Sequence, residues 1–142
     1  MSQDFGMCAC MNLRRTARLI AQFYDQELQP GGLRNTQFTL LATLRHQGPI
    51  ALSRLADLLG LDRTTLTRNV RPLQKAGLIG EQPAQDARVR LLSLTKKGEA
   101  AIASATPYWK KAQSEFLKKF GKERWQFLRG ELSDINLALT DN

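Results

Sequence analysis

The chain has 142 residues, which is enough for one domain with its own hydrophobic core but leaves no room for a separate enzyme domain. Its 21 lysines and arginines against 13 aspartates and glutamates give a formal net charge of +8, which favours a polyanionic partner without distinguishing nucleic acid from an acidic protein or a membrane surface. No apolar run approaches the ~20 residues that span a bilayer, and no basic segment leads a hydrophobic stretch at the N-terminus, so we expect a cytoplasmic protein with no membrane partner.

Apolar residues at helical spacing predict a long amphipathic helix over residues 7–28. Leu13 and Ile20 share its apolar side, whereas Arg14 and Arg18 occupy much of the opposite side. A helix of this kind needs a packing partner for its apolar face.

A shorter helix is predicted over residues 37–46, after the proline and glycines of residues 30–32 break the first one. Thr36 is its expected N-cap, because a threonine hydroxyl can accept a bond from an unpaired amide of the first turn. Residues 48–49, a Gly-Pro pair, mark another break, and Ile50 is expected to form a short strand.

The stretch from residue 52 to residue 94 organises the rest of the chain. Its first helix carries four apolar residues at i, i+3, i+4 and i+7, which form one buried stripe: Leu52, Leu55, Ala56 and Leu59. Gly60 ends this helix, because glycine enters the left-handed backbone region without a Cβ penalty. Asp62 is the expected N-cap of the next helix, where its carboxylate also suits the positive end of the helix dipole.

The helix after Asp62 has two chemically different sides. Leu66, Val70 and Leu73 share one side, and a cationic, hydroxylated set lies opposite: Thr64, Arg68, Arg71 and Lys75. Such a helix fits the major groove of B-DNA, where arginine bonds guanine O6 and N7 and threonine bonds a base edge or touches the thymine methyl.

The candidate DNA-binding residues of this helix are Arg63, Thr64, Thr65, Thr67, Arg68 and Arg71. Thr64, Thr65 and Arg68 are expected at base edges, with Arg63 and Arg71 nearer to phosphates. The alternative, a solvated helix face, is the usual interpretation of an isolated charged stripe. The capped helix before it and the hairpin after it argue against that alternative here.

Pro72 interrupts the pattern of this helix. It removes the amide that would bond the carbonyl of Arg68, and a proline inside a helix costs about 3 kcal/mol. We expect the helix to bend or end there, so base contacts should come from its N-terminal two turns.

A β-hairpin is predicted from strands at residues 78–82 and 89–94 around a polar loop. Arg88 near its tip and Arg90 at its base are candidates for an adjacent minor groove, because narrow A·T tracts attract guanidinium groups. Asp86 is expected to orient these arginines through its carboxylate. The alternative is a surface turn with incidental charge.

Two more helices are predicted at the C-terminal end. Thr95 should cap a long helix that runs to about Phe120, with Pro107 as a bend. Gly121 separates it from a last helix whose apolar residues repeat at three and four: Trp125, Leu128, Leu132, Ile135 and Leu139. This stripe needs a partner, so we infer that the first helix and the last two build a homodimer interface; the alternative is a monomer that packs them within the chain.

In the order and spacing of its segments the chain resembles the MarR family of bacterial transcription regulators, over residues 37–41, 52–68, 73–79, 86–90 and 92–98. The resemblance implies an obligate homodimer on palindromic double-stranded DNA, usually repressing genes for efflux, detoxification or aromatic catabolism. The chain departs from the family pattern at Ala51, where a serine or threonine cap is frequent, and at Pro72.

The predicted fold is mainly α with a small β-wing (α+β). A winged helix-turn-helix core at residues 35–94 lies between an N-terminal dimerisation helix in residues 1–34 and C-terminal dimerisation helices in residues 95–142, as one structural domain. The predicted function is a sequence-specific DNA-binding transcriptional regulator; the alternative is a winged-helix protein-interaction module without specific DNA binding. No Ser-His-Asp set, glycine-rich phosphate loop or isolated carboxylate pair is assembled by the spacing, so we expect neither enzyme activity nor a cofactor.

Cys8 and Cys10 lie at the start of the first predicted helix, and cytoplasmic thiols are expected to be reduced. Two residues apart on a helix they point nearly opposite ways, so an unstrained disulfide between them is not expected. Cys8 and Cys10 are the candidate oxidant sensors. The resemblance favours Cys10, because organic-hydroperoxide sensors of the family carry a reactive cysteine in this part of the helix, and Tyr24 lies where one of its tyrosine partners is expected. A second tyrosine partner is missing, since Asn35 lies at its place. The alternative is a buried or idle thiol.

Many relatives respond instead to small aromatic or phenolic effectors. The candidate pocket residues for such a ligand are Phe23, Tyr24, Phe38 and Trp109, although aromatic residues at helical spacing are also ordinary core. The single histidine, His46, is distant in sequence from both cysteines, so no metal site is predicted.

Overall fold

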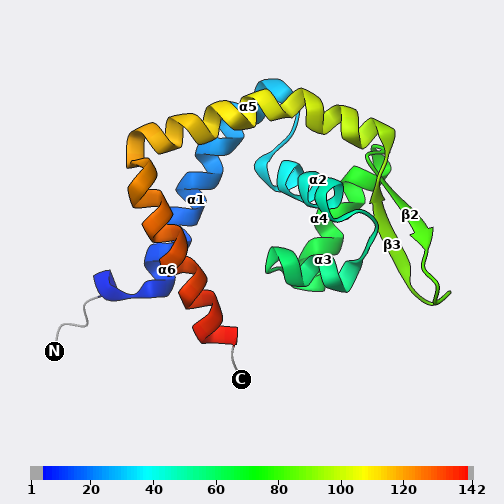
Figure 1. Cartoon of the computed structure of the whole chain (residues 1–142), viewed down its shortest axis with the longest axis horizontal. Coiled ribbons are helices and arrows are strands. Elements are labelled where there is room, and N and C mark those ends of the chain that lie inside the picture. The colour runs from blue at the N-terminus through cyan, green and yellow to red at the C-terminus, as the bar shows by residue number, and fades with distance from the viewer. Residues whose placement is uncertain (1–4, 141–142) are drawn as a thin grey trace.

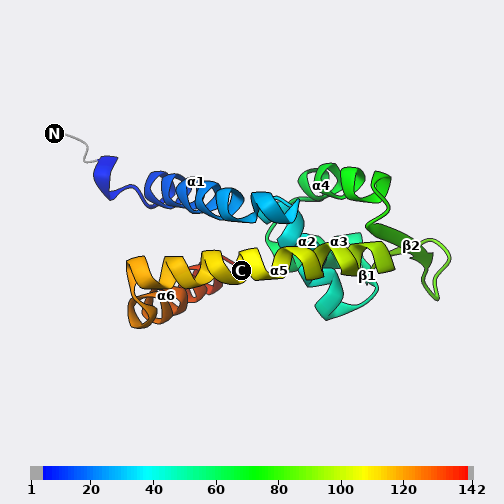
Figure 2. The same cartoon turned by 90° about the horizontal axis from the view of Figure 1, so that it is seen from above.

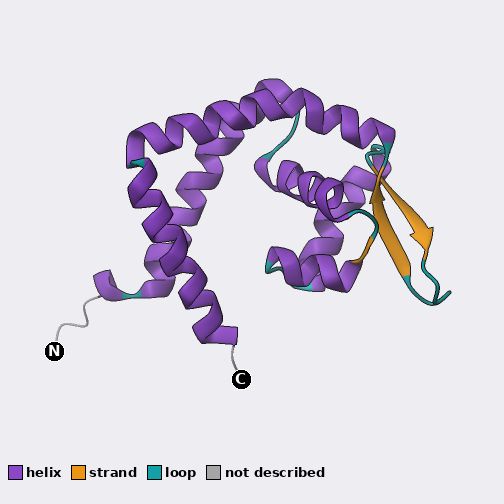
Figure 3. Ribbon diagram, viewed as in Figure 1, coloured by secondary structure: helices purple, strands orange, loops and turns teal. Residues whose placement is uncertain are grey.

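The computed structural model describes residues 5–140, which form a mainly helical chain with one small antiparallel sheet (Figures 1 and 3). This is the predicted fold class. In chain order the elements are η1 (Phe5–Met7), α1 (Ala9–Leu28), η2 (Gln29–Gly31), α2 (Asn35–Gln47), β1 (Ile50–Ala51), α3 (Leu52–Leu59), α4 (Arg63–Lys75), β2 (Ile79–Pro83), β3 (Arg90–Leu94), α5 (Lys96–Phe120) and α6 (Lys122–Thr140).

One hydrophobic core joins α2, α3, α4, the sheet and the N-terminal part of α5. Leu41, Leu55, Leu66 and Ile102 are each completely buried in it. The stripes predicted for α3 and α4 therefore face this core, as helical periodicity requires. Burial of several leucines in this way, at about 25 cal/mol per Å² of apolar surface, positions α3 and α4 against each other.

The sheet has the strand order β1-β3-β2 and is antiparallel throughout. Ile50 pairs with Leu92, which confirms the predicted short strand, and Ile79 pairs with Leu94. The strands β2 and β3 project as a wing beyond the helical core (Figure 3). Each wing strand begins one residue later than predicted.

The predicted N-cap of α2 is wrong. The helix begins at Asn35, and Thr36 lies inside its first turn. Asp25 of α1 supplies the acceptor instead: its Oδ1 accepts the backbone N–H of Asn35 at 2.7 Å and the Asn35 side-chain amide at 2.8 Å. A first-turn amide of α2 is thus bonded by a carboxylate from α1 and not by the Thr36 hydroxyl, as was expected.

Neither proline ends its helix. The helix α4 continues past Pro72 to Lys75, and α5 is one helix from Lys96 to Phe120 through Pro107. Of the two outcomes expected at Pro72, a bend or an end of α4, the end is therefore wrong. Packing of Val70 and Leu73 in the core offsets the single backbone hydrogen bond that Pro72 removes.

The helix α6 and the N-terminal half of α1 extend away from the winged core (Figures 1 and 2). No residue of α6, all of which the structure describes, is buried, and Phe127 and Leu139 expose 72% and 79% of their surface. In α1 every residue from 9 to 19 is exposed, including Met11 and Leu19. The single chain therefore leaves apolar surface on both helices uncovered.

Candidate nucleic-acid interface

The helix α4 separates a buried side from an exposed side. Leu66, Val70 and Leu73 are buried in the core. The opposite side carries the exposed residues Thr64, Arg68 and Arg71, which belong to the set predicted to face outward. The predicted orientation of the helix is confirmed.

Asp62 is the N-cap of α4, as predicted. Its Oδ1 accepts the backbone N–H of Thr65 at 2.7 Å, and its Oδ2 accepts the Thr65 hydroxyl at 2.8 Å. The Thr67 hydroxyl donates to the carbonyl of Arg63 at 2.8 Å. The hydroxyl protons of Thr65 and Thr67 are thus donated to acceptors of the protein. The hydroxyl of Thr64 has no hydrogen-bond partner among residues 5–140.

The bonds to Thr65 lower the pKa of Asp62 below its ordinary value, and the backbone N–H of Thr65 is the largest cause. A depressed folded pKa means that the cap stabilises the protein above the ordinary aspartate pKa and that this contribution is lost as pH falls through the folded pKa. Asp62→Asn keeps a cap acceptor but removes the charge. Between about pH 6 and about pH 3 we expect the melting temperature of this variant to fall less than that of the wild-type protein. Identical pH profiles for the two proteins, followed by thermal unfolding, would contradict a role for the ionised cap.

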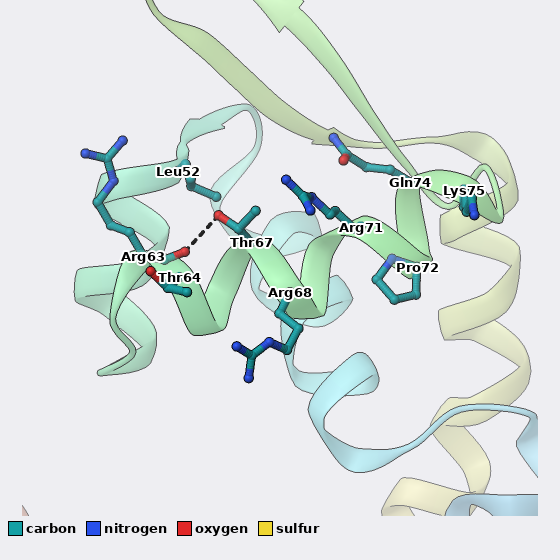
Figure 4. Close-up of a pocket in the computed structure, with 9 residues that line it drawn as sticks. All are labelled: Leu52, Arg63, Thr64, Thr67, Arg68, Arg71, Pro72, Gln74 and Lys75. Carbon is teal, nitrogen blue, oxygen red and sulfur yellow. Dashed lines mark hydrogen bonds between the residues drawn. The ribbon is translucent and has the colours of Figure 1, made fainter.

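A surface hollow of about 970 Å³ follows the exposed side of α4 (Figure 4). Its lining is Leu52, Arg63, Thr64, Thr67, Arg68, Arg71, Pro72, Gln74 and Lys75. Figure 4 shows Arg71 and Gln74 on the side of α4 nearer to the hairpin and Arg68 on the other side. The lining thus includes every candidate residue of this helix except Thr65, whose hydroxyl is bonded to the cap.

A second hollow, of about 470 Å³, lies between α4 and the wing. Arg71 and Gln74 line it from α4, Glu81 from β2, and Arg88 and Arg90 from the other side of the hairpin. The structure therefore brings the wing arginines to the same concave surface as the exposed side of α4. This surface, comprising the two hollows, is the candidate nucleic-acid interface.

The predicted partner of the wing arginines is corrected. Asp86 accepts the backbone N–H of Arg88 at 3.0 Å and so shapes the turn, rather than binding a guanidinium. The carboxylate that contacts Arg90 is Glu81, whose Oε2 lies 3.4 Å from the Arg90 Nε. Glu81 is across the hairpin in β2, so the contact depends on strand register.

The cationic groups of α4 are not neutralised by the protein. Within residues 5–140 no carboxylate lies within ion-pair distance of Arg63, Arg68, Arg71 or Lys75, and the same holds for Arg88. Unpaired guanidinium groups along a concave surface attract polyanions and can bond phosphates and base edges. The candidate interface is therefore suited to a nucleic acid.

Cys8 and Cys10 are exposed and form no disulfide with each other. Cys8 is the N-cap of α1, with extended backbone angles, so the expectation that both cysteines lie on the helix is wrong for Cys8. Tyr24 lies about 21 Å along α1 from Cys10, at about 1.5 Å of rise per residue, and therefore does not reach it within one chain. Its hydroxyl donates to Oε1 of Gln113 in α5 instead, and burial raises the Tyr24 pKa.

The four candidate aromatic residues separate into two pairs. Phe38 stacks on Trp109 with ring centroids 5.7 Å apart, and both line a shallow hollow of about 440 Å³ over α2 and α3. Phe23 and Tyr24 make an edge-to-face pair at 5.8 Å and are absent from that lining. The predicted four-residue pocket is thus not assembled within one chain.

No group of three or more His, Cys, Asp or Glu side chains is placed to hold a metal ion within the described residues. Among the helices of the same part of the chain, none is long and apolar enough to cross a membrane.

Sequence reasoning missed Gln74 and Glu81. Gln74 Nε2 donates to Glu81 Oε1 at 2.8 Å, which links α4 to the wing. Gln74 lies beyond the proline that was expected to bend or end the helix. The hairpin register, which places Glu81 opposite Leu92 and near Arg90, was the available signal for the second residue.

Comparisons with known proteins agree on one family. A family model described as "MarR family" matches residues 33–89. The chain is 30% identical over 111 residues to the HTH-type transcriptional regulator YwoH of Bacillus subtilis, across 78% of this chain and 81% of that protein. It is 29% identical over 134 residues to the HTH-type transcriptional regulator PecS of Dickeya dadantii, across 92% of this chain and 81% of that protein.

Solved structures give the same result. The structure of the Mycobacterium tuberculosis transcriptional regulator MosR in complex with DNA superposes with a TM-score of 0.84 and 39% identity, covering 93% of this chain and 96% of that one. A mutant of MarR from Escherichia coli, complexed with operator DNA, has a TM-score of 0.83 at 21% identity, covering 94% of this chain and 99% of that one, and is similar in fold.

Proposed function

Because this chain belongs to the MarR family and is a transcriptional regulator, we propose that it binds double-stranded DNA sequence-specifically, with α4 in the major groove and the wing in the adjacent minor groove. The observation that carries this proposal is the continuous concave surface on which the unpaired arginines of α4 meet Arg88 and Arg90 of the wing. The similarity to MosR, solved with DNA, supports it.

The proposed functional unit is a homodimer formed by α1, α5 and α6. The support is the uncovered apolar surface of α6, where Ile135 and Leu139 continue the stripe begun by Trp125 and Leu128. A two-fold axis would place two copies of α4 about one DNA turn, roughly 34–36 Å, apart. The operator would then be an inverted repeat, and occupancy of a promoter by such a dimer represses transcription.

Selection of bound sequences from random duplexes tests this proposal. We expect a palindromic consensus with half-sites one helical turn apart, and binding that weakens steeply with salt, because several arginines release counterions from phosphates. The alternative, a winged-helix module that docks on protein, would yield no consensus. The recovered sequence would also locate the regulated genes.

We propose two kinds of effector that release the protein from DNA, and the first is an oxidant. Cys10 is exposed in the first turn of α1, where a hydroperoxide can reach it. Attack of its thiolate on the peroxide would give cysteine sulfenic acid and an alcohol, and the altered side chain would shift the packing of α1 in the dimer.

Cys10→Ser is expected to bind the selected duplex like the wild type and to remain bound after treatment with an organic hydroperoxide that releases the wild-type protein. Cys8→Ser is the matched control, because it removes the thiol at the N-cap, two residues before Cys10. A gel-shift titration with peroxide measures both. Release of Cys10→Ser at the wild-type peroxide concentration would exclude Cys10 as the sensor.

The second proposed effector is a small aromatic molecule. The stacked Phe38 and Trp109 present ring surface in a hollow that His46 also lines. Because this hollow lies over α2 and α3, an occupant there would act on the helix pair that positions α4. Quenching of tryptophan fluorescence on titration with aromatic acids, lost in Trp109→Leu, tests this effector.

A further inference from the structure

Glu81 joins three elements of the candidate interface. One oxygen of its carboxylate, Oε1, accepts Nε2 of Gln74 from α4 at 2.8 Å. The other, Oε2, lies 3.4 Å from Nε of Arg90 in β3. A single side chain on β2 therefore contacts both the recognition helix and the opposite wing strand.

Glu81 also carries the one negative charge in the lining of the hollow between α4 and the wing. The hollow between α4 and the wing is lined by Ala51, Leu52, Ser53, Arg63, Thr67, Val70, Arg71, Gln74, Glu81, Arg88, Val89, Arg90 and Leu92. Its charged lining thus consists of four arginines and one carboxylate. A negative charge at that place opposes the approach of a phosphate backbone, which the rest of the lining attracts.

The contacts of Glu81 do little for the stability of the fold. The Glu81 and Arg90 side chains are 42% and 57% exposed, and ion pairs that exposed contribute little because water and salt screen them. The bond from Gln74 to Glu81 is likewise at the surface, where it competes with water. The effect of Glu81 should therefore be sought in binding rather than in folding.

We propose that Glu81 is a specificity-determining and positioning residue for DNA recognition, which orients Gln74 and Arg90 and disfavours binding driven by charge alone. This inference rests on the proposed DNA-binding function. The two effects of Glu81 act on different complexes, and together they widen the gap between specific and non-specific affinity.

The charge acts mainly on non-specific complexes. Binding to an arbitrary duplex is almost entirely electrostatic and does not fix the position of the DNA on the protein. Phosphates therefore approach all parts of the candidate interface, including Glu81. In the specific complex the register is fixed by base contacts. The carboxylate then stays bonded to Gln74 and Arg90, away from the phosphates, and its penalty is smaller.

The positioning acts mainly on specific complexes. An arginine held through Nε keeps its terminal nitrogens available as donors, and Arg90 has no other ion-pair partner within residues 5–140. Restraining Arg90 and Gln74 before DNA arrives lowers the side-chain entropy lost when they are fixed against the duplex. A loosely registered complex gains nothing from this restraint.

Glu81→Gln tests the inference, because glutamine keeps the size and an acceptor oxygen but removes the charge. Glu123→Gln is the matched control: it changes the net charge equally, in the first turn of α6 and outside the lining of the groove. The probes are the duplex selected from random sequences and a shuffled duplex of equal composition, each titrated at ~0.1 M salt, where exposed charges still act over about 10 Å.

We expect Glu81→Gln to raise affinity for the shuffled duplex on the order of 3- to 10-fold relative to Glu123→Gln, while affinity for the selected duplex changes by less than about 3-fold. The ratio of the two affinities therefore falls. Glu81→Asp keeps the charge but is too short to hold both partners. It should leave affinity for the shuffled duplex at the wild-type value and lower affinity for the selected one.

The outcomes are separable. If the wild-type protein binds the selected duplex but Glu81→Gln behaves like Glu123→Gln, the role of Glu81 is overturned and DNA binding stands. A rise in shuffled-duplex affinity for Glu81→Asp as large as that for Glu81→Gln would also overturn it, because the charge is retained. If the wild-type protein shows no salt-dependent binding to either duplex, both the proposed function and this inference fail.

Discussion

Replacing Arg68 with alanine is expected to lower affinity for the selected duplex by roughly 5- to 150-fold, the equivalent of about 1–3 kcal/mol for a bidentate arginine–guanine contact. Arg68 is exposed near the middle of α4 and has no ion-pair partner among the described residues. Its buried neighbours Leu66 and Val70 hold the helix in place, so the substitution removes a functional group without disturbing the core.

The affinity of Arg68→Ala for a shuffled duplex should fall by no more than on the order of 3- to 10-fold, the effect of one charge at this surface, because base contacts contribute little to non-specific binding. Fluorescence anisotropy with the two duplexes gives both numbers. Equal losses on the two duplexes would mean that Arg68 contacts phosphate, and no loss on either would remove it from the interface.

Arg88→Ala provides the contrast. This wing arginine is exposed, and its guanidinium has no ion-pair partner within residues 5–140. Its loss should weaken both duplexes more uniformly and reduce the dependence of log affinity on log salt by about one. A specificity ratio that collapses for Arg88→Ala but not for Arg68→Ala would reverse the roles assigned to helix and wing.

The orientation of α3 and α4 could be predicted from the sequence because it depends on local periodicity. Leucines such as Leu55 and Leu66 belong to stripes that recur every three or four positions, and only one side of each helix is apolar. Gly60 and Asp62 mark where α3 ends and α4 begins. Gly60 adopts the left-handed backbone region at φ 66°, and Asp62 caps α4. Once those faces are set, the exposed position of Arg68 follows.

Contacts between distant segments could not be predicted in the same way. The N-cap residue of α2 is Arg34, and the carboxylate that accepts the Asn35 amide comes from Asp25 in α1. The partner of Arg90 is Glu81 across the hairpin rather than the nearby Asp86. In both cases a tertiary carboxylate takes the place of a local group. Spacing along the sequence predicts contacts within a helix or turn. It does not predict how separate helices or strands pack against one another.

The prolines show how tertiary packing outweighs a local preference. Pro72 costs α4 one backbone bond, yet Val70 and Leu73 on either side of it are buried. The helix therefore extends to Lys75 and brings Gln74 to the wing. The part of the interface between α4 and the wing was missed for this reason.

Gly98→Ala is expected to reduce the free energy of unfolding by about 1–3 kcal/mol or more, as overpacking at a rigid contact does. A Cβ on Gly98 would lie 2.2 Å from the carbonyl oxygen of Leu78 and 2.6 Å from Cδ1 of Leu94. The carbonyl is backbone and cannot rotate away. It also accepts the N–H of Thr95 at 3.2 Å and the Thr95 hydroxyl at 3.1 Å, and both bonds would be strained.

Gly130→Ala is the matched control, since Gly130 also lies within a helix but has nothing within 4 Å of an added Cβ. Alanine there should stabilise the protein by about 0.5–1 kcal/mol through its higher helix propensity. Urea unfolding followed by circular dichroism compares the two. A Gly98→Ala protein that unfolds at the wild-type urea concentration would show that α5 is not seated against Leu78.

The functional consequence of this joint extends beyond stability. Thr95 caps α5 by accepting the Gly98 N–H at 3.0 Å, and its hydroxyl also donates to the carbonyl of Gly77 at 2.6 Å, at the end of the helix-turn-helix. These hydrogen bonds thus join the winged core to the N-terminal end of α5. Any movement of α5 in a dimer would then carry α4 and the wing with it. If Gly98→Ala remains folded in low urea, it should therefore lose affinity for the palindrome while retaining affinity for a single half-site, a difference that gel-shift assays on the two duplexes can measure.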